Sequence, residues 1–129
     1  MCSSDLTWTA INTGIPTGAY TRTIREDPVR RGLLYAGTEV GVYVSFDDGG
    51  HWEPLQLNLP RASVRDLTIH GTDLIAATHG RAFWMIDDIS SLRQLADSVT
   101  TRKAFLFQPA AAMRWFAGGG RSQIGRAHV

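Results

Sequence analysis

Several features are scarce or missing in this sequence, and each shortage limits what the chain can be. Cys2 is the only cysteine, and it carries no information about redox compartment or catalysis because it lies in a segment that looks foreign. No apolar run is long enough to cross a bilayer, so we expect no membrane span. The formal net charge is +1 without a basic or acidic run, which argues against nucleic acid as a partner and against an acidic disordered tail.

The remaining composition predicts an all-β chain with enough apolar residues for a core. At 129 residues, 43% of them hydrophobic, the chain is at most one ordinary domain. Its 13 glycines and 5 prolines are spread between short hydrophobic runs, as in chains of short strands joined by turns.

Both ends of the chain have the pattern of a sequencing-library adapter. Residues 1–6 can be encoded by GTG TGC TCT TCC GAT CT, and the reverse complement of this DNA encodes Ile-Gly-Arg-Ala-His, the sequence of residues 124–128. We therefore expect residues 1–6 and 124–129 to be adapter-derived and exclude them from the fold argument. Residues 7–123 are then an internal piece of a longer gene.

The most specific pattern is Ser-x-Asp-x-Gly-x-x-Trp, formed by Ser45, Asp47, Gly49 and Trp52. It follows a run rich in β-branched and aromatic residues, and glycine with aspartate favours a tight turn there. This is the Asp-box signature. In Asp-box proteins the serine and aspartate side chains hold backbone N–H groups of the hairpin, and the tryptophan packs beneath it. We therefore interpret Asp47 as a turn former rather than a catalytic carboxylate.

The chain repeats itself with a period of about 40–45 residues. Trp8 and Trp52 are 44 residues apart, and Pro16 and Pro60 show the same spacing. Further matches pair residues 20–24 with 64–67, 34–38 with 74–78, and 41–48 with 81–88, the last of which aligns Tyr43 with Phe83. Such a period with four short strands per unit is typical of a β-propeller blade. A WD-repeat origin would need a Trp-Asp pair at the end of the third strand, which is missing.

These patterns predict a propeller fragment of about two four-stranded antiparallel blades with a short helix. Residues 7–59 would hold the end of one blade and a full blade, and residues 60–108 a last, degenerate blade. The expected strands are 20–25, 33–37, 40–45, 51–55, 64–70, 73–78 and 82–86, and the fourth strand of the last blade is not visible in the sequence. A capped helix is expected over 88–96, an edge strand over 103–107 and an exit linker over 109–123. Three glycines in that linker lack the Lys-Ser/Thr of a phosphate loop, and no cofactor is expected.

Several segments together resemble the last blades of a bacterial family of large BNR-repeat proteins, also described as sortilin-N-terminal-like and often labelled glycosyl hydrolases. The segments are 24–28, 33–39, 44–50, 55–60, 64–67 and 77–81. The resemblance implies a secreted or periplasmic protein whose remaining propeller blades are partners of this fragment. The hydrolase label rests on a fold and repeat shared with sialidases and xyloglucanases, and a fold does not carry a function.

Propeller ligand sites usually lie on the face opposite the Asp-box turns, and two hypotheses follow for that face. In the first, a binding or scaffold propeller, Glu39, His79 and Arg81 would contact a glycan or peptide. In the second, a glycoside hydrolase, two carboxylates would lie roughly 5–5.5 or 6.5–9.5 Å apart, and Arg22, Arg65 and Arg81 could grip a substrate carboxylate.

Each of these residues also has a structural interpretation. Arg22 and Arg65 occupy matching places in the repeat and would suit repeat-specific salt bridges. His79 has no second ligand at metal-binding spacing, so it would act as a hydrogen-bonding loop residue, and we expect no metal site. Whether the parent is an enzyme stays open at this point, and the fragment alone is expected to be inactive because two blades cannot close a propeller.

Overall fold

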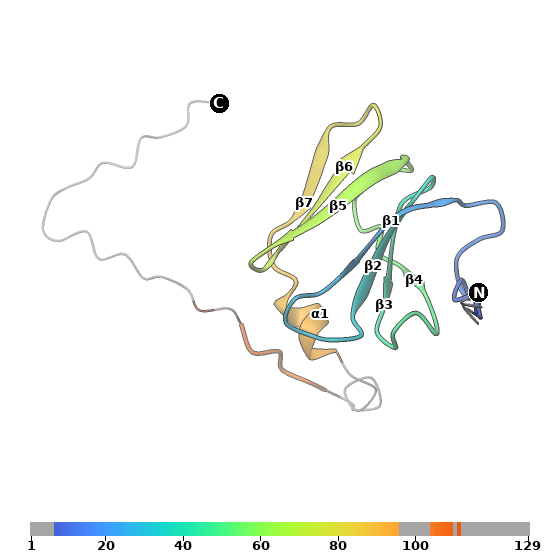
Figure 1. Cartoon of the computed structure of the whole chain (residues 1–129). Coiled ribbons are helices and arrows are strands. Elements are labelled where there is room, and N and C mark those ends of the chain that lie inside the picture. Colours follow the sequence, from blue (N-terminus) through green and yellow to red (C-terminus); the bar gives the residue numbers. More distant parts are fainter. Residues whose placement is uncertain (1–6, 96–103, 110, 112–129) are drawn as a thin grey trace, which may run out of the picture.

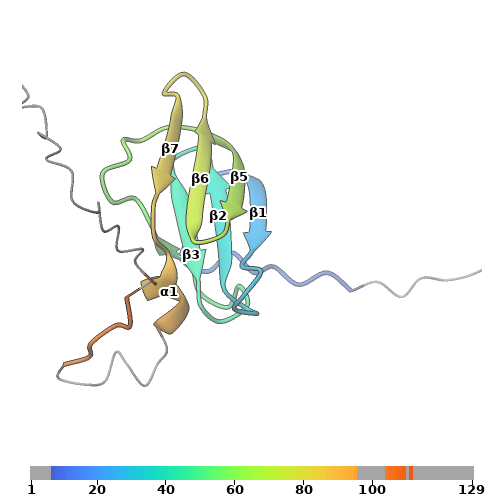
Figure 2. The ribbon, with the colours of Figure 1, turned by 90° about the vertical axis from the view of Figure 1, so that its left-hand side faces the viewer.

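The computed structural model describes residues 7–95, 104–109 and 111. The adapter-like ends lie outside this range, as do residues 112–123 of the expected linker. The described part is mostly β, with two antiparallel sheets and one short helix, as the sequence predicted. Figure 1 shows the two sheets side by side, and Figure 2 shows that one lies in front of the other.

The first sheet has four strands in the order β1-β2-β3-β4. The strands are β1 (Thr21–Glu26), β2 (Leu34–Thr38), β3 (Val42–Ser45) and β4 (Glu53–Pro54). Each pairs with the next strand along the chain, so the sheet is a simple meander.

The second sheet has three strands in the order β5-β6-β7, and no fourth strand follows within the described residues. The strands are β5 (Val64–His70), β6 (Asp73–Thr78) and β7 (Phe83–Ile86). The helix α1 (Ser90–Gln94) follows instead. The expected edge strand over 103–107 is wrong for its described part, since residues 104–109 have no regular structure and lie against α1 through two hydrogen bonds between Gln94 and Gln108.

The two sheets have the same register on their first three strands. Ala36 of β2 lies opposite Ile24 and Tyr43, and Ala76 of β6 lies opposite Leu67 and Trp84. The sequence match of Tyr43 with Phe83 was therefore wrong by one residue. The reason is the turn before the third strand, which is one residue longer in the second sheet.

That turn is closed in the same way in both sheets. The Thr38 N–H donates to Gly41 O (2.9 Å), and the Thr78 N–H donates to Ala82 O (3.2 Å). The threonine hydroxyls donate to the same two carbonyls. The internal repeat is thus a repeat of three-dimensional structure as well as of sequence.

The main core lies between the two sheets. Its buried members come from both sheets and from the segments that follow them: Leu33, Tyr35, Val42, Val44, Leu59, Val64, Leu67, Leu74, Ala76 and Ile89. A second cluster lies on the far side of the first sheet, away from the second, and consists of Leu34, Ala36, Tyr43 and Trp52. The first sheet is therefore apolar on both faces, as expected for a sheet packed between two neighbours.

Helix α1 is held against the first sheet by a buried ion pair. Arg93 Nε donates to Asp27 Oδ2 (2.9 Å), with side-chain exposures of 13% and 0%. Asp27 also accepts the backbone N–H groups of Val29 and Arg30 at 2.8 Å. The Arg30 side chain donates to carbonyls at the end of α1, including Leu92 O at 3.0 Å, where a cation is favourable.

The helix itself begins differently from a side-chain-capped helix. No side chain caps the position of Ile89, but Asp88 Oδ1 accepts the Ser90 N–H at 2.8 Å, one residue earlier than the assigned boundary. Such one-residue differences in helix boundaries are common. Ile89 is fully buried and Leu92 packs on the main core, so the apolar side of this segment faces inward.

Candidate functional site

The turns of both sheets fall at two opposite ends of the molecule. The β6–β7 loop is at the top of Figure 1, whereas α1 and the β3–β4 turn are at the bottom. The first residues of β1 and β5 lie at the same end as the β2–β3 and β6–β7 turns, since Thr21 pairs with Thr38 and Val64 with Thr78. We call this end the rim.

An ion pair between Arg22 and Glu39 lies at the rim. Arg22 Nε donates to Glu39 Oε1 at 2.6 Å, and Arg22 Nη2 contacts the same oxygen. The hydrogen bond from Arg22 is the main cause that holds the pKa of Glu39 below its ordinary value. Because the Arg22 side chain is exposed and that of Glu39 is partly exposed, the pair orients the two groups more than it stabilises the fold.

Arg65 and Ser63 complete the same group. The Ser63 hydroxyl and the charge of Arg65 both lower the pKa of Glu39 further. The Ser63 Oγ is buried and makes no hydrogen bond with a described residue, so Ser63 lies near Glu39 without a direct bond to it. We call Arg22, Glu39, Ser63 and Arg65 the rim cluster.

Two equivalent β-bulges place the arginines of the rim cluster. The register of β1 shifts between Thr21 and Thr23, and that of β5 shifts between Val64 and Asp66. A bulge leaves one residue unpaired and turns its side chain. The residue inside each bulge is an arginine, so the repeat presents Arg22 and Arg65 in the same way.

The structure places His79 and Arg81 at the rim, where their side chains make no hydrogen bond or ion pair with the rim cluster among the described residues. The His79 N–H donates to Ser63 O at 2.8 Å, which fixes the β6–β7 loop beside Ser63. Arg81 is exposed on the same loop, and its carbonyl accepts the Trp84 indole N–H at 2.7 Å. Of the five proposed ligand-binding residues, the structure therefore brings Arg22 and Glu39 into direct contact, and Arg65 acts on Glu39 through its charge without an ion pair.

The Asp-box residues lie at the opposite end and hold their own turn. Asp47 Oδ1 accepts the Ser45 hydroxyl (2.7 Å) and the His51 N–H (2.9 Å), while Ser45 Oγ accepts the Gly49 N–H (2.9 Å). The bond from His51, followed by that from Ser45, lowers the pKa of Asp47. Both hydrogen bonds that Asp47 Oδ1 accepts therefore hold its own turn.

Trp52 connects this turn to the chain before β1. Its side chain is 2% exposed, and its Nε1–H donates to Ile11 O at 2.6 Å. Its backbone N–H donates to Thr13 O at 2.8 Å. The indole is therefore wedged between the first sheet and the preceding segment.

The rim cluster has the chemistry of a charged binding surface. The groups that act on Glu39 are Arg22, Ser63 and Arg65, with no carboxylate among them. Arg65 and Arg81 have no salt bridge within the described residues, so the rim carries more positive than negative charge. No group of three or more metal-ligating side chains occurs in the part of the chain that the structure describes.

Sequence reasoning missed a second set of contacts that joins the sheets beside the rim cluster. Arg25 donates to Leu67 O (2.9 Å) and to Asp66 Oδ1 (2.8 Å), which links β1 to β5. Nothing in the spacing of Arg25 and Asp66 marks them as partners. Ser63 was also missed as a neighbour of Glu39.

Comparison with known proteins adds no identification. No protein-family model matches this chain, and no curated protein matches it significantly. No helix in the described ranges has the length and apolar character needed to span a membrane.

Proposed function

We propose that the chain is two successive blades of a larger β-propeller whose rim binds a glycan, a peptide or a protein without catalysis. The observation that carries the proposal is the structural repeat, which ends at the rim with the same bulged arginine in both sheets. Repeated units that present one side chain to a common surface are suited to building a binding face. In this proposal the protein is the BNR-repeat, sortilin-like type that its sequence resembles, and it works outside the cytoplasm.

The exposed face of the second sheet supports the presence of further blades. Val42 and Val44 of the first sheet are buried against the second sheet. By register, Phe83 and Met85 occupy the same positions in the second sheet, yet they are 78% and 57% exposed. Positions that are apolar in both sheets and covered in only one indicate that a further sheet covers the second face.

The charge of the rim favours an anionic ligand. Glu39 neutralises one arginine, and Arg65 and Arg81 remain without ion-pair partners among the described residues. A guanidinium group pairs with a carboxylate through two parallel hydrogen bonds. We therefore expect acidic glycans or acidic peptide segments to bind better than neutral ones.

The alternative, a glycoside hydrolase propeller, receives less support from this part of the chain. A general acid needs a carboxyl group with a raised pKa, whereas Arg22 lowers the pKa of Glu39. The Asp47 carboxylate is engaged by its own turn at the opposite end. In this proposal Glu39 serves the ion pair of the rim and Asp47 serves its turn, rather than the two carboxylate roles of a glycoside hydrolase.

Two experiments test the proposal. Amide chemical shifts of the ¹⁵N-labelled chain should change at the rim when sialyllactose or an acidic peptide is added. The change should be weaker in Arg65→Ala. It should persist in the control Arg31→Ala, which alters an exposed arginine outside the rim. Shifts that are absent, or equal in both variants, would refute rim binding. Hydrolysis of aryl glycosides or sialosides by the longer parent protein would refute the non-catalytic function.

A further inference from the structure

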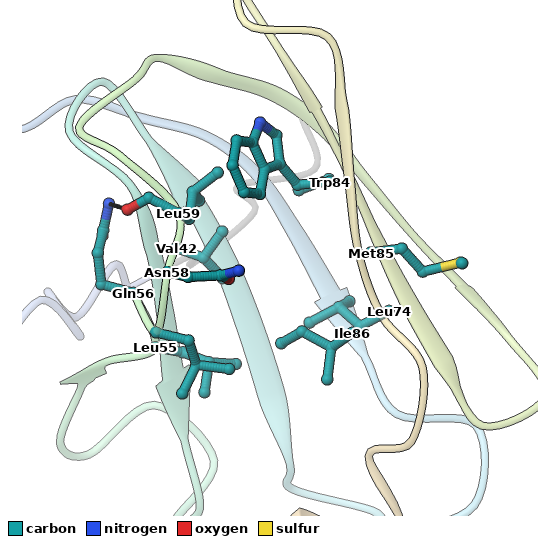
Figure 3. A pocket seen from close by; sticks show the side chains of 11 residues that line it. Val42, Leu55, Gln56, Asn58, Leu59, Leu74, Trp84, Met85 and Ile86 are labelled. Atoms are coloured by element: carbon teal, nitrogen blue, oxygen red, sulfur yellow. Dashed lines mark hydrogen bonds between the residues drawn. The ribbon is translucent and has the colours of Figure 1, made fainter. Parts of the chain in front are cut away.

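The apolar pocket between β7 and the segment 55–59 is too small to serve as a ligand site (Figure 3). Leu55, Leu59, Trp84 and Ile86 contribute to its lining. Its volume of about 30 Å³ suits one or two water molecules. Chemically reactive neighbours lie instead in the Asp-box turn, where an aspartate is followed directly by a glycine.

We propose that the Asp48–Gly49 bond is a site of spontaneous isoaspartate formation, and that the Ser45 hydroxyl controls the rate by holding the Gly49 N–H. In this reaction the Gly49 nitrogen forms a bond to Cγ of the protonated Asp48 carboxyl group. The bond from Cγ to the hydroxyl oxygen breaks, and this oxygen leaves as water with the proton from the nitrogen. The product is a cyclic succinimide.

Hydrolysis of the succinimide completes the modification. Water opens the ring at one of its two carbonyl groups and gives either aspartate again or isoaspartate, whose backbone runs through the former side chain. The reaction consumes and releases only water, so it needs no oxidant and no cofactor. It also does not depend on the rim binding a ligand.

The sequence and the exposure of Asp48 favour this reaction. Glycine has no side chain that hinders ring closure onto the preceding residue. Each of the other aspartates in the sequence is followed by a residue that has a side chain. Asp48 is exposed, so water reaches its side chain for the hydrolysis. Among the aspartates, Asp48 is therefore the expected site.

The fold requires a glycine after Asp48. The φ angle of Gly49 is +89°, a conformation that favours glycine. A Cβ atom at this position would lie 2.9 Å from Ile11 Cδ1. Ile11 is held there because its carbonyl accepts the Trp52 indole N–H. The turn therefore keeps a reactive Asp-Gly pair for a structural reason.

In the folded turn the attacking nitrogen is engaged. The Gly49 N–H donates to Ser45 Oγ at 2.9 Å, and both residues are buried. The Ser45 hydroxyl donates in turn to Asp47 Oδ1 at 2.7 Å. The Asp48 N–H donates to Gly32 O at 3.0 Å, which fixes the other reacting residue. The nitrogen can attack only after the turn opens locally, so the reaction rate follows the frequency of opening.

Isoaspartate at this position keeps the turn from closing again. It adds one carbon atom to the backbone between Asp48 and Gly49. The N–H groups of Gly49 and His51 then no longer lie opposite their side-chain acceptors. Modified molecules should therefore unfold at a lower urea concentration than unmodified ones.

The test compares isoaspartate formation at Asp48 in the full chain and in a blocked peptide of residues 43–52, both in the same buffer. Proteolytic digestion and mass spectrometry locate and count the modified residue. The peptide has the reactive pair without the fold, so the full chain should react at least about tenfold more slowly. Ser45→Ala should raise the rate in the full chain about fivefold or more, the factor expected for loss of one hydrogen bond.

The matched control is Thr78→Val, which removes a hydroxyl that donates to a backbone carbonyl at the opposite end of the molecule. Its rate should equal that of the unchanged chain. Amide hydrogen exchange at Gly49 should accelerate in Ser45→Ala by the same factor as the modification, while protected β2 amides show that the sheet is intact. In the unchanged chain, urea below the unfolding transition should raise both rates together, a measurement that needs no variant.

Three results would overturn the proposal. One is isoaspartate formation at equal rates in the full chain and in the peptide. Another is faster exchange at Gly49 in Ser45→Ala, or in low urea, without faster modification of Asp48. The third is an equal acceleration in Thr78→Val, which would assign the rate to the stability of the whole chain rather than to the Ser45 hydroxyl.

Discussion

Replacing Trp52 by phenylalanine should destabilise the chain by about 2 kcal/mol. The indole Nε1–H donates to Ile11 O at 2.6 Å, and loss of such a bond costs about 1 kcal/mol. The smaller ring leaves a cavity of about 40 Å³, which at about 24 cal/mol per Å³ costs about 1 kcal/mol more. Both effects depend on the burial of Trp52, which is 2% exposed.

The matched control is the same substitution at Trp8, whose side chain is 91% exposed. Trp8→Phe should change the free energy of unfolding by less than about 0.5 kcal/mol. Urea unfolding followed by far-UV circular dichroism measures both variants without relying on tryptophan fluorescence. Equal effects of the two substitutions would refute the conclusion that Trp52 wedges the Asp-box turn.

Two further predictions concern charged groups of the fold. Arg93→Ala should lower the free energy of unfolding, measured with urea, by about 3–5 kcal/mol because it leaves the Asp27 carboxylate buried without its cation. The control Arg31→Ala should lower it by less than about 0.5 kcal/mol. A loss below about 1 kcal/mol in Arg93→Ala would contradict the buried ion pair. The bond from His51 lowers the pKa of Asp47, so this carboxylate adds stability above the unfolded-state pKa of about 3.9 that disappears as the pH falls below it. Asp47→Asn should flatten that acid-side decline in melting temperature, and an unchanged slope would contradict the role of Asp47.

Much of the strand pattern followed from the sequence because it depends on neighbours along the chain. Alternating β-branched and aromatic residues between glycine-rich turns located all seven strands to within a few residues. The Ser45 and Asp47 spacing predicted a turn held by its own side chains, since donors and acceptors four residues apart meet in any tight turn of this type. The one-residue error at Tyr43 arose because a longer turn changes the register without changing the pattern.

The sequence by itself determined the repeat, the Asp-box turn and the all-β class, because each is encoded in short-range spacing. Only the tertiary structure decided which charges meet: Arg22 with Glu39, Arg25 with Asp66, and Arg93 with Asp27. The last pair is 66 residues apart along the chain, and no local pattern connects such partners. Their contact exists because the main core packs the two sheets together.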